Sequence, residues 1–143
     1  MNKNKYLRIF ISTFIMSLGL FAITACSNGD VVSNDAPASK AVYEQITSEQ
    51  AKNLMDTQTN YIILDTRTDS EFAQGHIKDA ILIPYDEIAE QAGSKLPDKN
   101  QLILVYCRSG NRSKKASQTL AELGYTNVKE FGGIIDWQYE IVK

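Results

Sequence analysis

The stretch that decides the fold is Val105-Tyr106-Cys107-Arg108-Ser109-Gly110-Asn111-Arg112-Ser113. It continues an apolar run that begins at Leu102 and predicts a buried strand, and it precedes a segment, 114–123, with apolar residues at helical spacing. Cys107 is therefore expected between the end of a strand and the beginning of a helix. A helix beginning supplies unpaired backbone N–H groups and a partial positive charge, and both favour a thiolate over a thiol.

The residues after Cys107 are suited to holding an anion. Arg108 and Arg112 favour the thiolate by their charge, and thiols in such surroundings titrate between about 3.5 and 7.5 instead of near 8.5. Gly110 and Asn111 tolerate the positive φ that lets successive amides converge on one point. The alternative, a buried structural cysteine, does not require these neighbours. We predict that Cys107 is the catalytic nucleophile and that the substrate is bound by Arg108, Ser109, Gly110, Asn111 and Arg112.

Strands and helices alternate along the rest of the chain. Strands are predicted at 43–46, 61–64, 80–83, 102–106 and 128–131. Helices are predicted after Thr47 or Ser48, at 69–72 up to Gly75, at 85–91, and at 114–123 up to Gly124. This order predicts an α/β fold with a central, mostly parallel sheet and helices on both faces. Sites in such sheets collect at the carboxyl ends of the strands, where Cys107 is expected.

The first 25 residues have the pattern of an export signal. Three basic residues precede an apolar segment at 9–23, which is short for a membrane span, since a span needs about 20 predominantly apolar residues. The segment leads into Ile23-Thr24-Ala25-Cys26, which resembles the lipobox of bacterial lipoproteins. That resemblance implies removal of residues 1–25, acylation of Cys26, and a domain held on the extracytoplasmic side of a bacterial cell membrane. An ordinary signal peptide or a single membrane anchor is the alternative.

The remaining chain consists of a tether and one domain. Residues 26–41 are mostly small and polar and predict a flexible, lipidated tether, and residues 42–143 have the length of a single domain. Removing residues 1–25 takes away three basic residues and no acidic one, which changes the formal charge from −2 to −5. An acidic domain is poorly suited to nucleic acid, so no nucleic-acid partner is expected. With Cys26 acylated, Cys107 has no partner for an internal disulfide, which favours a reactive role.

Residues 43–139 resemble a single-domain rhodanese, or sulfurtransferase homology domain. The matching segments are Ile63-Leu64-Asp65-Thr66-Arg67, Glu71-Phe72-x-x-Gly75-His76-Ile77-x-x-Ala80, Ile83-Pro84, the loop from Cys107 to Ser113, Leu123-Gly124-Tyr125-x-x-Val128 and Gly132-Gly133-x-x-x-Trp137. The resemblance implies that Cys107 takes a sulfane sulfur from a small anionic donor such as thiosulfate, becomes a persulfide, and passes the sulfur to cyanide or a thiol. The loop amides would surround that persulfide. We expect a monomer that needs no cofactor or metal.

Two other functions stay open at this stage. A cysteine loop that ends in arginine also describes cysteine phosphatases and arsenate reductases, but five residues separate cysteine from arginine there, and only four separate Cys107 from Arg112. The shorter loop should fit a single sulfur better than a tetrahedral phosphate. A persulfide carrier or sensor without turnover would need the same cysteine, so the sequence does not separate it from an enzyme.

Three further polar residues are expected to be structural. His76 is the single histidine, and it has no second His or Cys at the spacing of a metal site. Asp65 and Arg67 follow the end of a strand; we expect them to brace one another, Glu71 or nearby backbone groups.

Overall fold

The computed structural model describes residues 42–143, so the predicted signal peptide, Cys26 and the tether through residue 41 lie outside the described residues. The described strands are β1 (Glu44–Gln45), β2 (Tyr61–Asp65), β3 (His76–Ile77), β4 (Ile81–Leu82), β5 (Leu102–Cys107), β6 (Val128–Gly133) and β7 (Ile141–Val142). The helices are α1 (Ser48–Thr57), α2 (Asp69–Gln74), α3 (Ile88–Lys95), α4 (Asn111–Glu122) and a 3-10 turn, η1 (Ile134–Asp136).

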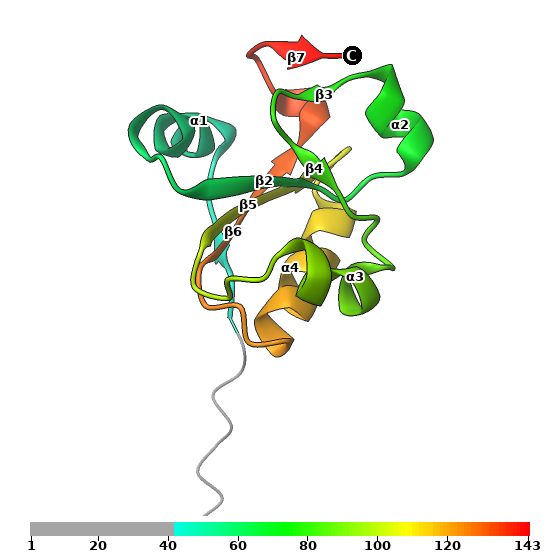
Figure 1. The fold of residues 1–143 in the computed structure, drawn as a ribbon. Coiled ribbons are helices and arrows are strands. Elements are labelled where there is room, and N and C mark those ends of the chain that lie inside the picture. Colours follow the sequence, from blue (N-terminus) through cyan, green and yellow to red (C-terminus); the bar gives the residue numbers. More distant parts are fainter. Residues whose placement is uncertain (1–41) are drawn as a thin grey trace, which may run out of the picture. The chain divides into compact units, whose positions relative to one another are not determined.

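Five strands form one parallel sheet in the order β1-β6-β5-β2-β4 (Figure 1). All six residues of the central strand β5 are buried, as its continuous apolar run predicts. A separate antiparallel pair, β3 and β7, joins the middle of the chain to its carboxyl end. Strands of two residues are too short to show a periodicity, and the sequence did not predict this pair.

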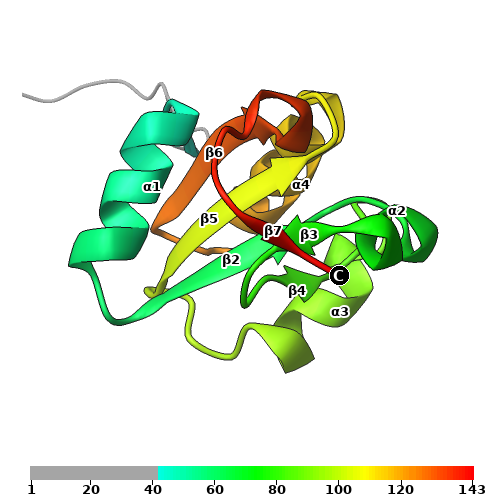
Figure 2. The same cartoon turned by 90° about the horizontal axis from the view of Figure 1, so that it is seen from above.

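Helices cover both faces of the sheet, as predicted (Figure 2). One core contains Leu64 and Val105 with apolar residues of α3 and α4, and the other contains Ile63 and Leu104 with apolar residues of α1. Consecutive residues of one strand enter opposite cores because side chains alternate across a sheet. The alternation of strands and helices along the sequence therefore led to the correct fold class.

Two capping boxes define helix beginnings. Thr47 caps α1, and its hydroxyl accepts from the amide of Gln50 while the Gln50 side chain accepts from the Thr47 amide. Thr68 caps α2 in the same way with Glu71. Gly75 follows α2, as predicted, and no helix among residues 42–143 is long and apolar enough to span a membrane.

Two predicted helix ranges were wrong at their beginnings. The segment after Pro84 first forms a turn in which Glu87 N–H donates to the Pro84 carbonyl, so α3 occupies Ile88–Lys95 instead of 85–91. Helix α4 begins at Asn111, three residues before the predicted 114, because Gly110 turns the chain with a φ of 94°. Asn111 is accordingly helical, and its predicted positive φ is not observed.

Candidate active site

Cys107 is the last residue of β5 and lies at the carboxyl edge of the sheet. The turn that leads into α4 contacts its side chain: Gly110 N–H donates to Cys107 Sγ at 3.1 Å. The left-handed conformation of Gly110 aims that amide back toward the strand end, which a residue with a Cβ would do only under strain. Only 1% of Cys107 is exposed, so the sulfur lies beneath the loop.

The loop favours the thiolate form of Cys107. Burial raises the pKa of the thiol, but hydrogen bonds from the Ser113 hydroxyl and from the amides of Ser113, Ser109 and Gly110 together lower it by more, and the net pKa lies below the ordinary value. These amides belong to a loop and to the first turn of a helix, where they have no partner within the helix. The predicted convergence of amides on the sulfur is therefore present.

Two buried polar residues beneath the loop were not predicted as site residues. Ser113 Oγ lies 2.6 Å from Oε1 of Glu130 and 2.9 Å from the Gly110 carbonyl, and Gly132 N–H donates to the same Oε1 at 2.9 Å. The hydroxyl has one hydrogen, and the short contact to Glu130 competes with a bond to the sulfur. We conclude that the backbone amides are the steadier support of the thiolate, while Glu130 fixes the loop to β6.

Gly133 makes room for the loop. A Cβ built on Gly133 would overlap the Arg108 carbonyl and would lie 2.6 Å from Ser109 Cα, closer than real Cβ atoms come. Its own φ of −122° is ordinary, so the requirement for glycine is one of space and not of backbone conformation. Strands β5 and β6 shift register at this point, where Cys107 pairs with Gly133.

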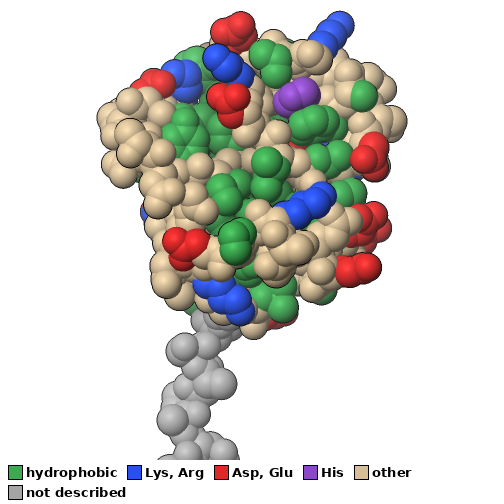
Figure 3. Space-filling view, in the orientation of Figure 1, with side chains coloured by type: hydrophobic (Ala, Val, Ile, Leu, Met, Phe, Trp, Pro, Cys, Tyr) green, Lys and Arg blue, Asp and Glu red, His purple; other side chains and the backbone are tan. Residues whose placement is uncertain are grey.

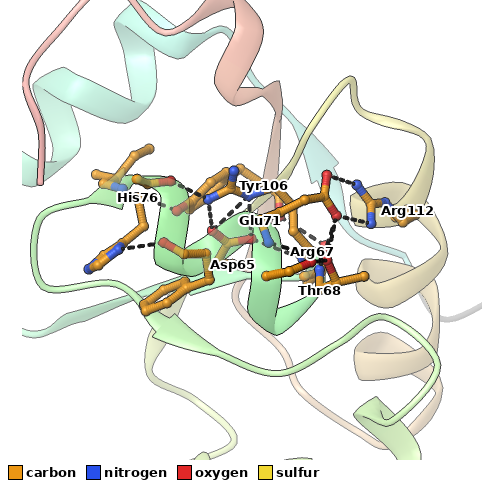
Figure 4. A network of polar contacts seen from close by, with 12 residues as sticks. Asp65, Arg67, Thr68, Glu71, His76, Tyr106 and Arg112 are labelled. Atoms are coloured by element: carbon orange, nitrogen blue, oxygen red, sulfur yellow. Dashed lines mark hydrogen bonds and ion pairs between the residues drawn. The ribbon is translucent and has the colours of Figure 1, made fainter. Parts of the chain in front are cut away.

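Arg112 is held by a carboxylate from another helix. Its Nη1 and Nη2 donate to the two carboxylate oxygens of Glu71 at 2.7 and 2.8 Å, and both side chains are about three-quarters buried, with 26% and 23% exposed (Figure 4). Arg112 holds the pKa of Glu71 at about 2, and Glu71 in turn raises the pKa of Arg112, with a smaller contribution from Cys107. The sequence had not paired Arg112 with any acid: Glu71 was expected to brace Asp65 or Arg67.

The other predicted loop residues lie around the rim. Ser109 and Asn111 are exposed, and Arg108 lines an open hollow of about 360 Å³ beside α2 and η1. The hollow also contacts Arg67, Glu71, Gln74, Gly75, Ile134, Ile135 and Ile141. Arg108 has no ion-pair partner among residues 42–143.

The three polar residues expected to be structural have structural partners. Arg67 binds both oxygens of Asp65, with Nη2 at 2.6 Å from Oδ2, and Nη2 also donates to the Gly75 carbonyl. His76 reaches the surface (Figure 3), where its ring stacks on Phe72 and Nδ1 lies 3.0 Å from the Phe72 carbonyl oxygen. The described residues contain no group of three or more His, Cys, Asp or Glu side chains that could hold a metal ion.

The sequence and the fold of residues 42–143 are similar to those of known proteins. Residues 47–140 match the model of the rhodanese-like domain. The chain belongs to the rhodanese family. Among curated rhodaneses, the thiosulfate sulfurtransferase PspE of Escherichia coli is 40% identical over 73 residues, which cover 51% of this chain and 70% of the relative. A sulfurtransferase of Allochromatium vinosum is 40% identical over 95 residues, which cover 65% and 86%.

Solved rhodanese structures share the fold. A rhodanese with anions from E. coli is 37% identical, with a TM-score of 0.55, over 58% of this chain and 98% of that chain. A rhodanese-like domain protein from Staphylococcus aureus is 34% identical, with a TM-score of 0.58, over 68% and 93%. These likenesses agree with the mostly parallel sheet and flanking helices described above.

Proposed function

We propose that this rhodanese is a membrane-anchored sulfurtransferase that carries a sulfane sulfur as a persulfide on Cys107. The observation that carries the proposal is the 3.1 Å hydrogen bond from Gly110 N–H to Cys107 Sγ, at the beginning of a helix. Relatives named thiosulfate sulfurtransferase or sulfurtransferase support the type of reaction.

The reaction has two nucleophilic displacements. In the first, the Cys107 thiolate attacks the outer sulfur of a donor such as thiosulfate; a new S–S bond forms, the old one breaks, and sulfite leaves with the electron pair. In the second, cyanide or a thiolate attacks the outer sulfur of the persulfide, and Cys107 leaves as a thiolate. The thiolate is the nucleophile from the start, so neither step needs a general base.

The loop stabilises the sulfur anion in both steps. Preorganised amides can hold a thiolate or a terminal persulfide sulfur without reorganising, as an oxyanion hole holds oxygen. The loop has four residues between Cys107 and Arg112, and its small cradle supports sulfur over a tetrahedral phosphate. A carrier or sensor would use the same persulfide and differs only in turnover.

Treatment of the full-length protein with thiosulfate tests the reaction. We expect Cys107 to gain the mass of one sulfur atom and to lose it on addition of cyanide, with thiocyanate formed over many turnovers. Cys107→Ser should show neither. Efficient hydrolysis of an aryl phosphate without any persulfide would overturn the proposal, and a persulfide that forms but does not turn over would select the carrier.

The membrane anchor rests on the lipobox resemblance at Ile23-Thr24-Ala25-Cys26. Two acyl chains are enough for stable anchoring, and a lipobox cysteine carries at least a diacylglycerol. In a bacterial host, metabolic labelling with a fatty acid should label the wild-type chain and the Cys107→Ser variant. Labelling that persists in Cys26→Ala would contradict the anchor and leave the sulfur chemistry untouched.

A further inference from the structure

The charges around Cys107 nearly cancel. Three arginines lie at the loop or in the hollow beside it: Arg67, Arg108 and Arg112. Asp65 binds Arg67, Glu71 binds Arg112, and a third carboxylate, Glu130, lies beneath the loop against Ser113. Arg67 and Arg112 are each bound by two hydrogen bonds or more to a carboxylate. A site that receives an anion next to a thiolate would gain from a surplus of positive charge, and this site has little.

Among these carboxylates, Glu71 neutralises the arginine of the cysteine loop, Arg112. Arg112 lies in the first turn of α4, close enough to Cys107 for the thiolate to raise the pKa of its guanidinium. Glu71 lies on α2, 41 residues earlier in the sequence, and its carboxylate accepts hydrogen bonds from both terminal nitrogens of the Arg112 guanidinium. Glu71 therefore neutralises the guanidinium next to Cys107, while Arg108 in the hollow has no ion-pair partner among residues 42–143.

We propose that Glu71 sets the charge selectivity of the site, and that the site is suited to sulfur donors with one negative charge, such as an organic persulfide R–S–S⁻, over dianions such as thiosulfate. This inference rests on the proposed sulfur transfer. The Cys107 thiolate attacks the outer sulfur of R–S–S⁻, a new S–S bond forms at Cys107, and R–S⁻ leaves with the electron pair of the broken bond.

The size of the effect depends on the charge of the donor. The Coulomb energy between Glu71 and a donor is proportional to the donor charge, so a dianion is disfavoured by twice the energy of a monoanion. Because a rate depends exponentially on the energy barrier, doubling the energy squares the factor by which the rate changes. If removing the Glu71 charge improves a monoanion about threefold, it should improve a dianion about tenfold.

Glu71→Gln removes the charge with little change in structure. Glutamine also serves at this position of a capping box, so the bond from the Thr68 amide can be kept. Asp69→Asn is the matched control, because Asp69 is exposed, lies in the same turn of α2 and carries the same charge, but is not paired with Arg112.

The two donors to compare are thiosulfate and methanethiosulfonate, CH₃–SO₂–S⁻, in which a methyl group replaces one oxygen and one negative charge is lost. Each transfers its outer sulfur to Cys107 and leaves as sulfite or methanesulfinate. In full-length protein with cyanide as acceptor, Glu71→Gln should raise kcat/KM about tenfold for thiosulfate and about threefold for methanethiosulfonate. Asp69→Asn should change the ratio of the two values by much less.

A second readout separates charge from a structural role. Freed from Glu71, Arg112 should lower the pKa of Cys107, so the midpoint of thiol alkylation against pH should move down in Glu71→Gln and stay in place in Asp69→Asn. An unchanged donor ratio, or an equal loss of activity with both donors, would overturn the inference while leaving sulfur transfer intact. Wild-type protein that forms no persulfide with either donor would instead remove the proposed function.

Discussion

The carbonyl group of Arg108 passes directly over Cα of Gly133, with no space for a side chain between them. The same segment is tied down by a hydrogen bond from Ile135 N–H to the Arg108 carbonyl at 3.3 Å. The cysteine loop thus rests on the end of β6, and its height above the sheet is set by one glycine.

Gly133→Ala should lift the loop and lower activity. A Cβ at this position must displace backbone atoms of Arg108 and Ser109, and misplacement of a reacting group by about 1 Å costs on the order of a hundredfold in rate. We expect kcat/KM for sulfur transfer to fall about ten- to a hundredfold. Gly93→Ala is the control, because a Cβ at Gly93 in α3 meets nothing within 4 Å. Equal activity of both variants would contradict the close packing.

The reactivity of Cys107 should follow a lowered pKa. Burial raises the pKa of Cys107, but the Ser113 hydroxyl and the loop amides together outweigh it, so the thiolate persists to lower pH than in an ordinary thiol. Plotted against pH, the rate of alkylation by a small reagent such as iodoacetamide should have its midpoint below about 8.5, the value of a free thiol. Because the sulfur is buried, the absolute rate should be low, and the midpoint is the quantity to compare. A midpoint at or above the value of a free thiol would refute the role of the amides.

Arg112→Ala should lower kcat/KM for thiosulfate by about ten- to a hundredfold, which corresponds to about 1.4 to 2.7 kcal/mol. The loss has two causes: the site loses a cation, and the carboxylate of Glu71 is left unpaired near the thiolate. Arg112→Lys should recover only part, since an ammonium group does not match two oxygens at once.

The double variant Glu71→Gln with Arg112→Ala tests the second cause. It should be more active than Arg112→Ala alone, because the unpaired carboxylate is gone. If the two single effects simply add, the coupling between these side chains is absent and the ion pair has no role in the reaction.

Titration of Glu71 checks the ion pair directly. The carboxyl signal of Glu71 in NMR should titrate with a pKa of about 2, and in Arg112→Ala it should move up toward the ordinary value of 4.5. A folded pKa below the unfolded one means that the pair stabilises the fold above about pH 4.5 and that this contribution is lost as the pH falls toward 2. Stability should therefore depend less on pH between these values in the Arg112→Ala variant than in the wild type.

Much of the fold could be predicted because the decisive signals are local. The apolar runs at 61–64 and 102–106 each became a buried strand, and Thr47 caps α1 through a residue three positions away. Cys107 was placed correctly for the same reason, since strand, turn glycine and helix are neighbours in the sequence.

The parts that were missed depend on distant contacts. Nothing near Glu71 indicates that its partner is Arg112, 41 residues later, and the role of Ser113 follows from a carboxylate on β6. One local signal was available: Glu130 lies two positions after Val128 in the predicted strand 128–131 and so shares its face, and a buried carboxylate in a strand requires a partner. The first turn of α4 was missed because it lacks apolar residues and depends on the left-handed Gly110.

The near-complete burial of Cys107 has a consequence for what can react with it. A lowered pKa increases the fraction of thiolate, and a thiolate reacts with any oxidant or disulfide that can reach it. For Cys107, accessibility limits the reaction, because a bulky disulfide or protein cannot bring its sulfur to an atom that lies under the loop. A sulfane sulfur at the end of a chain can, because a single S–S bond of about 2 Å carries it ahead of the rest of the molecule. We therefore expect the loop to admit a small sulfur at the end of a donor and to keep bulky disulfides away from Cys107.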